Sequence, residues 1–249
     1  RLLRNPLASP DIVGITSGAS VGAVSFIVFA QGVAPFWQSI WALTGALIAA
    51  FVLLSLSWRQ QLSISRVVLI GICLNSGFAA ITTLLLVMSE STTSAMAYTW
   101  LTGTLYGAQP VVAQWIGLAA IVALTICLLL TRELSILSLN EEQQVGLGLP
   151  GLPVRIAVLC LTSAMAAIAV SVAGAIGFLG LLAPHLARQL LPGKLSIQLI
   201  GCAVIGADLL LIADLIGRTL FLPRDLPAGI FVAAVGGPFF VYLLARETR

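Results

Sequence analysis

Long apolar runs dominate this chain and limit what it can fold into. Hydrophobic residues make up 59% of the 249 residues, charged residues make up 8%, and the mean hydropathy is +1.10. The segments long and apolar enough to lie in lipid are 11–30, 37–57, 66–88, 111–130, 154–173, 174–191, 197–221 and 226–245. Because a backbone in lipid must satisfy its own hydrogen bonds, they predict an all-α, polytopic membrane protein with eight transmembrane helices and one membrane domain, residues 1–249.

Basic residues fall almost entirely on one side of the predicted membrane. With connections assigned alternately to the two sides, ten of the twelve Lys and Arg residues share a side: Arg1, Arg4, Arg59, Arg66, Arg132, Arg155, Arg188, Lys194, Arg246 and Arg249. The other side carries only Arg218 and Arg224. Because Lys and Arg are retained in the cytoplasm, we expect both ends of the chain to be cytoplasmic. The net charge of +3 reflects this bias and indicates no nucleic-acid partner.

Motifs that carry chemistry are few. The four cysteines lie singly in apolar runs, which is typical of packing residues and predicts neither a metal site nor a redox pair. Gly193-Lys194 lacks the first Gly and the Ser or Thr of a phosphate-binding loop, so this motif does not predict ATP binding. His185 follows Pro184 and is expected to be a polar packing residue at a helix kink.

Two connections interrupt the apolar pattern. The outer one, 89–110, carries Tyr98 and Trp100 at spacings that fit either a short interfacial helix or an ordinary surface loop. The inner one, 131–155, contains the pair Glu141-Glu142. These carboxylates would lie in the first turn of a short helix that projects into the cytoplasm and docks on a soluble partner, the alternative being a solvated turn. Ser138 or Asn140 would cap this helix, and Gly146 and Gly148 would end it.

The run 174–185 is broken by glycine and proline at Gly177, Gly180 and Pro184, just before His185. Here one span ends at the outer face and a short one returns. Interrupted helices at membrane depth often line a transport path, although glycines also permit close helix packing. Both interpretations stay open from the sequence.

Polar side chains within the spans are also candidate functional residues. Asn75, Ser76 and Thr82 could line a pore or bond between helices. Asp214 and Arg218 are four residues apart, so they can pair on one helix face. Asp208 faces elsewhere and needs another partner.

Several stretches, spread in order along the chain, resemble the permease subunits of type II ATP-binding-cassette importers, the family that takes up ferric siderophores, haem and cobalamin. The matching stretches are Arg4-Asn-Pro-Leu-Ala-Ser-Pro-Asp11, Trp100-Leu-Thr-Gly103-Thr-Leu-Tyr-Gly107, Gly177-Phe-Leu-Gly-Leu-Leu-Ala-Pro184-His185-Leu-Ala-Arg188, Ala213-Asp214-Leu-Ile-Gly-Arg218, Leu226-Pro227-Ala-Gly229 and Gly236-Gly-Pro238-Phe239. The resemblance implies a multi-pass protein of the bacterial cytoplasmic (inner) membrane. It also implies a ten-span fold, so we expect this chain, which starts at Arg1 without Met, to lack the first two spans.

The partners that the resemblance implies are a second permease subunit, similar or identical, two cytoplasmic ATPase subunits, and a substrate-binding protein outside. The chain itself would hold no cofactor or metal and catalyse no reaction. Ferric siderophore is the expected substrate, with haem and cobalamin as alternatives. An ion-coupled secondary transporter that uses Asp208 and Asp214 is the contrasting class.

Site residues follow from the motifs and the resemblance together. The expected translocation path contains Asn75, Ser76, Thr82, Trp100 and Gly103. The expected ATPase-coupling helix within 131–155 contains Leu139, Glu141, Glu142, Leu147 and Gly148. The expected binding-protein contacts are Arg218 and Arg224, and the broken-helix signature is Gly177, Gly180, Pro184 and His185.

The chain departs from the family pattern at three places. Ala175 stands where a Pro is usual, and Asp208 stands where the residue is normally apolar. The coupling helix usually reads Leu-Gly-Glu-Glu-x-Ala, whereas this chain has Leu139-Asn-Glu-Glu-Gln-Gln144. We therefore expect the coupling helix to be present but packed differently.

Overall fold

The computed structural model describes residues 14–30, 32–34, 36–58, 64–105, 110–137, 139, 141–148, 151–221 and 225–247. Within these ranges the chain is helical and contains no strand, which confirms the predicted all-α class. The helices are α1 Ile15–Phe29, α2 Phe36–Trp58, α3 Ile64–Met88, α4 Ser91–Leu101, α5 Pro110–Leu129, α6 Thr131–Ile136, α7 Glu141–Gly146, α8 Gly151–Ala173, α9 Leu179–Leu190, α10 Leu195–Thr219 and α11 Ala228–Glu247.

Five of the described helices are long and apolar enough to cross a membrane: α2, α3, α5, α8 and α10. The apolar parts of α1 and α11 are shorter, at Ile15–Phe29 and Ala228–Tyr242. Residues 11–13, where the first predicted span begins, lie outside the described ranges. The other helix boundaries agree with the predicted apolar runs to within a few residues. This agreement is expected because the thickness of the bilayer sets the length of both the apolar run and the helix.

The segment 174–191 differs from its prediction as a full span. Its helix, α9, has 12 residues and is about 18 Å long, which is less than the thickness of a hydrocarbon core. The preceding residues are non-helical because Gly174, with φ +73°, ends α8. Phe178, with φ +64°, then begins α9 in a left-handed conformation that is rare for a bulky residue.

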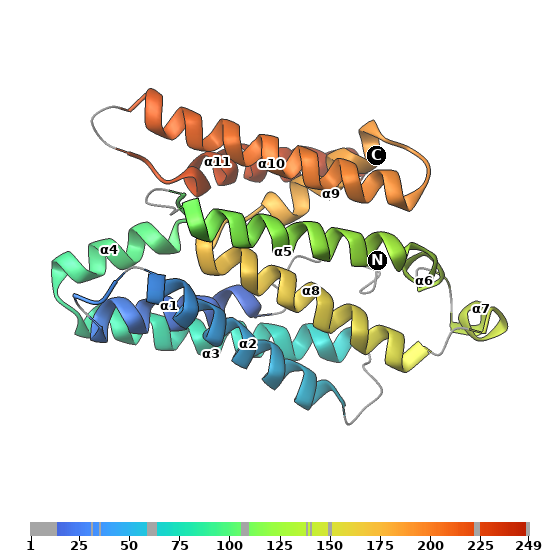
Figure 1. Ribbon diagram of the computed structural model, residues 1–249, viewed down its shortest axis with the longest axis horizontal. Helices are drawn as coiled ribbons and strands as arrows, with labels where there is room; N and C mark the ends of the chain where they lie inside the picture. The colour runs from blue at the N-terminus through green and yellow to red at the C-terminus, as the bar shows by residue number, and fades with distance from the viewer. Residues whose placement is uncertain are drawn as a thin grey trace.

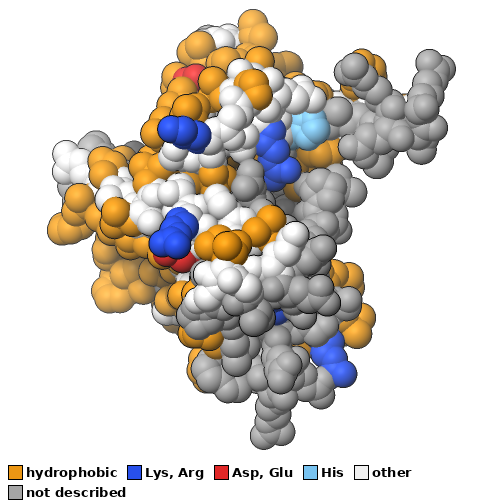
Figure 2. Space-filling model, turned by 90° about the vertical axis from the view of Figure 1, so that its right-hand side faces the viewer, with side chains coloured by type: hydrophobic (Ala, Val, Ile, Leu, Met, Phe, Trp, Pro, Cys, Tyr) orange, Lys and Arg blue, Asp and Glu red, His pale blue; other side chains and the backbone are white. Residues whose placement is uncertain are grey.

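The two ends of the molecule carry different charges. The short helices α6 and α7 lie at one end, which we name the α7 end, and α4 and the connection between α10 and α11 lie toward the other, the α4 end (Figure 1). The helix ends that carry Arg66, Arg155, Arg188 and Lys194 lie at the α7 end (Figure 1). Viewed from that end, several basic side chains are visible (Figure 2). Arg218, by contrast, lies in the last turn of α10, toward the α4 end, as the sequence predicts.

The helices pack as two lobes. In the first lobe α1 and α2 approach closely because glycines remove the intervening side chains: a Cβ on Gly22 would collide with the Trp41 carbonyl, and one on Gly45 with the Gly18 carbonyl. Small residues such as Ala19, Ala46 and Ala167 complete this core together with α3 and α8. The second lobe contains α9, α10 and α11, around a separate cluster that includes Leu182 and Val232.

Candidate translocation path and coupling segment

The connection at 89–110 contains a helix, α4, so the surface-loop interpretation of its first half was wrong. Thr93 and Ala97 on this helix are buried, and Trp100 packs against the core of the first lobe. Tyr98 is 58% exposed on the opposite side. The helix therefore has one face on the protein and one face outward, the arrangement expected of a helix at an interface.

Gly103 lies at a junction of three backbone segments, which we name the glycine junction: Trp100–Gly103, Gly174–Ile176 and Pro227–Gly229. Gly103 has φ +82°, and its carbonyl accepts a hydrogen bond of 3.0 Å from the Gly229 N–H. A Cβ on Gly174 would collide with the Trp100 carbonyl, and one on Gly229 with the Thr102 carbonyl. Only glycine permits this approach, so the junction fixes the end of α4 against the start of the broken run and of α11.

The candidate path residues of α3 differ in their surroundings. Asn75 and Ser76 are exposed, in line with the large apolar residues Leu69, Ile72 and Leu84 on the uncovered part of α3. Thr82 is buried, and its hydroxyl donates to the Phe78 carbonyl of its own helix at 3.0 Å. The structure thus leaves Asn75 and Ser76 available to a pathway or partner, whereas Thr82 belongs to the packing of the lobe.

In the broken run, Gly177 of the signature does not serve close packing. A Cβ on Gly177 would meet nothing within 4 Å, and Gly180 is exposed. The glycines that neighbouring segments approach closely are instead Gly174 and Gly236. The sequence interpretation did not single out Gly174, and Gly236 faces the Phe178 side chain. The sequence showed that both glycines lie in or near the motifs, but it did not indicate their role in packing.

Pro184 lies inside α9, and His185 follows it as a packing residue. The His185 ring stands edge-on to Phe239 with centroids 5.6 Å apart, and its Nε2 is 2.8 Å from the Gln189 amide nitrogen. These contacts agree with the expected role of His185 as a polar residue that packs within α9 and against α11.

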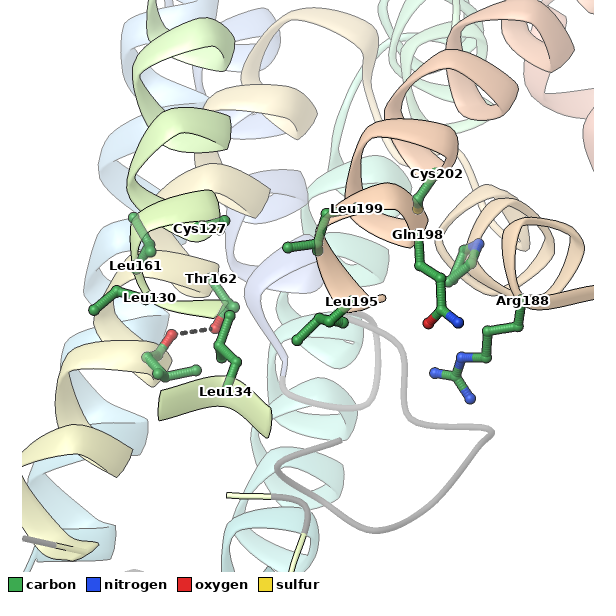
Figure 3. Close-up of a pocket in the computed structure, with 12 residues that line it drawn as sticks. Cys127, Leu130, Leu134, Leu161, Thr162, Arg188, Leu195, Gln198, Leu199 and Cys202 are labelled. Carbon is green, nitrogen blue, oxygen red and sulfur yellow. Dashed lines mark hydrogen bonds between the residues drawn. The ribbon is translucent and has the colours of Figure 1, made fainter. Parts of the chain in front are cut away.

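The described residues enclose a pair of cavities between the lobes, and α9 lines both. The first, of about 220 Å³, is bounded by α5, α6, α8, α9 and α10. Figure 3 shows Leu130 and Leu134 on one side of it, Leu195 and Leu199 on the other, and Arg188 and Gln198 at one edge. The second, of about 380 Å³, is lined by residues of the broken run, among them Gly174, Ile176, Gly180 and Pro184, which also lines the first.

The inner connection forms two short helices, α6 and α7, at the α7 end (Figure 1). The predicted acidic start is in place, because α7 begins at Glu141 and Glu142, although their side chains, like Ser138 and Asn140, lie outside what the structure describes. Gly146 is the last residue of α7, and Gly148 has φ +71°. The predicted glycine stop is therefore confirmed, and Leu139, Leu147 and Gly148 are exposed beside the helix.

One polar residue of α7 is buried, and the sequence interpretation did not assign it a role. Gln144 is 3% exposed, and its amide nitrogen donates to the Leu137 carbonyl at 3.3 Å and to the Leu139 carbonyl at 2.8 Å. Its amide oxygen accepts from Arg155 at 3.4 Å. The only signal in the sequence was that Gln replaces the usual Ala of the coupling-helix motif.

Asp214 and Arg218 form the predicted ion pair, with 2.7 Å between the Asp214 carboxylate and Arg218 Nε. The Arg218 guanidinium also donates to the Leu105 carbonyl at 3.4 Å. The Arg218 side chain is 44% exposed, so the pair leaves part of the guanidinium accessible at the α4 end. Asp208 is exposed on another face of α10, and Arg224 lies outside the described ranges.

Metal binding finds no support in the described part of the chain, where no cluster of three or more His, Cys, Asp or Glu residues could hold an ion. The four cysteines form no disulfide with one another.

Comparison with known proteins gives one consistent result. Residues 1–246 match the FecCD transport family. The chain is 42% identical over 247 residues to the achromobactin transport system permease protein CbrC of Dickeya dadantii, and it covers 71% of that protein, with 99% of the chain aligned. It is 35% identical to the vitamin B12 import system permease protein BtuC of Escherichia coli, with the whole chain aligned to 76% of that protein.

Solved structures agree. An inward-facing "metal-chelate type ABC transporter" superposes with a TM-score of 0.88 at 27% identity, over 98% of this chain and 79% of the other. The predicted permease resemblance and the location as a multi-pass protein of the inner membrane are thereby confirmed. This chain belongs to the FecCD transport family, the permeases of type II ATP-binding-cassette importers.

Proposed function

We propose that this chain is the permease subunit of an ATP-driven importer that moves a ferric siderophore into the cytoplasm. The observation that carries the proposal is that nearly the whole chain matches permeases named for iron chelates. The "Probable siderophore transport system permease protein YfhA" of Bacillus subtilis is 39% identical, and the Fe(3+)-citrate permease protein YfmE of the same organism is 36% identical.

Vitamin B12 is the second candidate substrate, because BtuC matches the whole chain at 35% identity. The described side chains do not decide between the two: the interlobe cavities are apolar and contain no cluster of metal ligands. Recognition of a large chelate by an external binding protein would leave little trace in the permease itself.

We place ATPase docking at α7. A six-residue helix at the end expected to be cytoplasmic, flanked by the exposed residues Leu139, Leu147 and Gly148, offers a compact protrusion for a groove on a soluble partner. Binding of ATP would close the paired ATPases, move α7, and rock the two permeases. In this mechanism the chain provides the translocation path and transmits the movement of α7 to the membrane helices, and the ATPases hydrolyse ATP.

We place the second permease against the exposed face of α3. Leu69, Ile72, Leu84 and Val87 are each more than half exposed there, and Asn75 and Ser76 lie among them. A second copy covering this face would bury the apolar residues and enclose the two polar ones near a shared pathway. The binding protein would dock at the opposite end from α7, beside Arg218.

The ion-coupled alternative has no such support. Asp214, which would have to bind and release a proton or ion, is held by Arg218, and Asp208 lies on a different face of the same helix. The two carboxylates therefore do not form a common site.

Reconstitution of the chain with its ATPase and binding protein tests the proposal. We expect ATP-dependent uptake of radioiron presented as a ferric siderophore, and no uptake when the ATPase carries a substitution that blocks hydrolysis. Uptake of labelled vitamin B12 but not of iron would move the assignment to the second candidate. Uptake driven by an ion gradient without the ATPase would refute the proposal.

A further inference from the structure

The helix α7 is too short to hold its own conformation. Isolated helices of fewer than about 12 residues are marginal in water, because few hydrogen bonds compensate for the cost of the first turn. This helix has six residues, Glu141–Gly146, and it emerges at the end of the molecule (Figure 1). Whatever keeps α7 ordered must come from contacts with the neighbouring segments.

Gln144 supplies such contacts in three directions. Its side chain is 3% exposed, and it donates to the carbonyl of Leu137, the last residue before the α6–α7 connection, and to that of Leu139 within the connection. It accepts from Arg155 in the first turns of α8. One amide group therefore joins the end of α6, the connection, α7 and α8.

An amide is suited to this position. Its NH₂ group can donate twice and its oxygen can accept, and the structure uses both donor bonds and the acceptor. Leaving the carbonyl of the buried Leu137 without this donor is unfavourable, and the three bonds together oppose any independent rotation of α7. The alanine that is usual at this place in the family motif could make none of them.

From this geometry we propose that Gln144 is the positioning residue that makes α6, α7 and the start of α8 move as one body, so that displacement of α7 is passed to the membrane helix α8. The inference rests on the proposed docking of the ATPase at α7 and deepens it. Gln144 does not touch ATP or substrate; it acts through the hydrogen bonds that fix the docking helix to α8.

Gln144→Met in the assembled transporter tests the proposal, because Met retains the length and volume of the side chain and removes all three hydrogen bonds. Gln114→Met, at an exposed position on α5, is the matched control. Amide hydrogen exchange of α7 and the amount of substrate imported per ATP hydrolysed are measured on the same preparation in lipid. For Gln144→Met we expect exchange in α7 to rise and import per ATP to fall, each about tenfold, with the control unchanged.

A second variant keeps the test decisive if the first assembles poorly. Gln144→Glu retains an acceptor for Arg155 but loses both donor bonds, so we expect the same direction of change. Unchanged exchange in α7 in the Met variant, or native exchange in the Glu variant, would overturn the positioning role of Gln144. Faster exchange with normal import per ATP would instead refute the proposed role of α7 as the coupling helix, and the two failures are thereby distinguished.

Discussion

At the scale of single residues, glycine positions separate into those that the fold requires and those that it does not. Gly103 requires its lack of a side chain twice, through φ +82° and through the Ile176 side chain and backbone that a Cβ would meet. A Cβ on Gly117, in the middle of α5, would meet nothing within 4 Å, and the backbone there has ordinary helical geometry. Both residues are glycine, and the structure shows that only Gly103 has a backbone angle and a neighbour that exclude a side chain.

Gly103→Ala is expected to destabilise the folded permease by about 2–4 kcal/mol, because left-handed geometry and overpacking both penalise the new methyl group. Gly117→Ala is the control, and we expect no loss, since Ala favours a helix over Gly by up to about 1 kcal/mol. Thermal unfolding of the two purified variants in detergent measures the difference. Equal unfolding temperatures would contradict the close approach at the glycine junction.

Two roles are open for Arg218: contact with the external binding protein, and the internal ion pair with Asp214. If its exposed part meets acidic groups of the binding protein, Arg218→Glu slows capture of that protein and reduces the salt dependence of the association rate. The internal pair with Asp214 is expected to contribute at most about 1 kcal/mol at this exposure, so the variant still folds.

Stopped-flow association at several salt concentrations measures the effect of Arg218→Glu, with Asp214→Asn as the control that breaks the same pair and keeps the arginine. Equal slowing in both variants would assign Arg218 to the ion pair alone. Slowing confined to Arg218→Glu supports the docking surface.

At the scale of elements, the sequence predicted the long helices and the short helix α7, but it did not predict how the run 174–191 is divided. The predicted runs at 37–57, 66–88 and 154–173 became α2, α3 and α8 because an apolar stretch in lipid has no better alternative than a helix. The run 174–191 is equally apolar, but the geometry of Gly174 and Phe178 divides it, and hydropathy does not record a backbone angle. The hydrogen bonds of Gln144 were also out of reach, because their carbonyl acceptors depend on how α6 and α7 fold back.

The glycine stop of α7 gives a prediction for this element. Gly148→Val forces a β-branched residue into φ +71°, which displaces the chain after α7 and should abolish transport-coupled ATP turnover while the permease still inserts. Gly146→Val is the control, because Gly146 is also exposed but has no positive φ. ATP hydrolysis stimulated by the loaded binding protein is the measurement. Normal stimulated hydrolysis in Gly148→Val would count against the coupling assignment.

On α3, exposure divides the polar residues into two expected classes. Ser76→Trp should slow release of substrate without loss of assembly, since Ser76 is exposed on the face assigned to the pathway. Thr82→Trp should impair folding instead, because Thr82 is buried in the lobe. Uptake rates and the yield of assembled complex are compared for the two variants. Unaffected uptake in Ser76→Trp would exclude this part of α3 from the path.

At the scale of the whole molecule, charge and architecture agree on one orientation. The helix ends that carry most of the described basic residues lie at the α7 end, and Arg218 lies toward the α4 end, so we expect the α7 end to face the cytoplasm. The sequence predicted this division without any knowledge of packing, because the rule concerns where charge is retained during insertion. It could not predict the two-lobed arrangement or the interlobe cavities, which depend on side chains distant in the sequence.

Single-cysteine labelling tests the orientation in a variant without the four native cysteines. Met96→Cys and Leu147→Cys place thiols at exposed positions on α4 and beside α7. A membrane-impermeant maleimide added to intact cells should label position 96 and leave position 147 unlabelled until the membrane is opened. The reverse pattern would invert the topology and with it both docking assignments.

The glycine junction has a consequence for the order of events during synthesis. The hydrogen bond from Gly229 to Gly103 joins positions separated by 229 − 103 = 126 residues. At about 5–20 residues per second, a ribosome needs on the order of 6–25 s to supply the second partner after the first. Throughout that interval the Gly103 carbonyl lacks this donor, so the contact between the end of α4 and the start of α11 can form only after Gly229 has been made. A product terminated before residue 229 would therefore lack the hydrogen bond that joins the end of α4 to the start of α11.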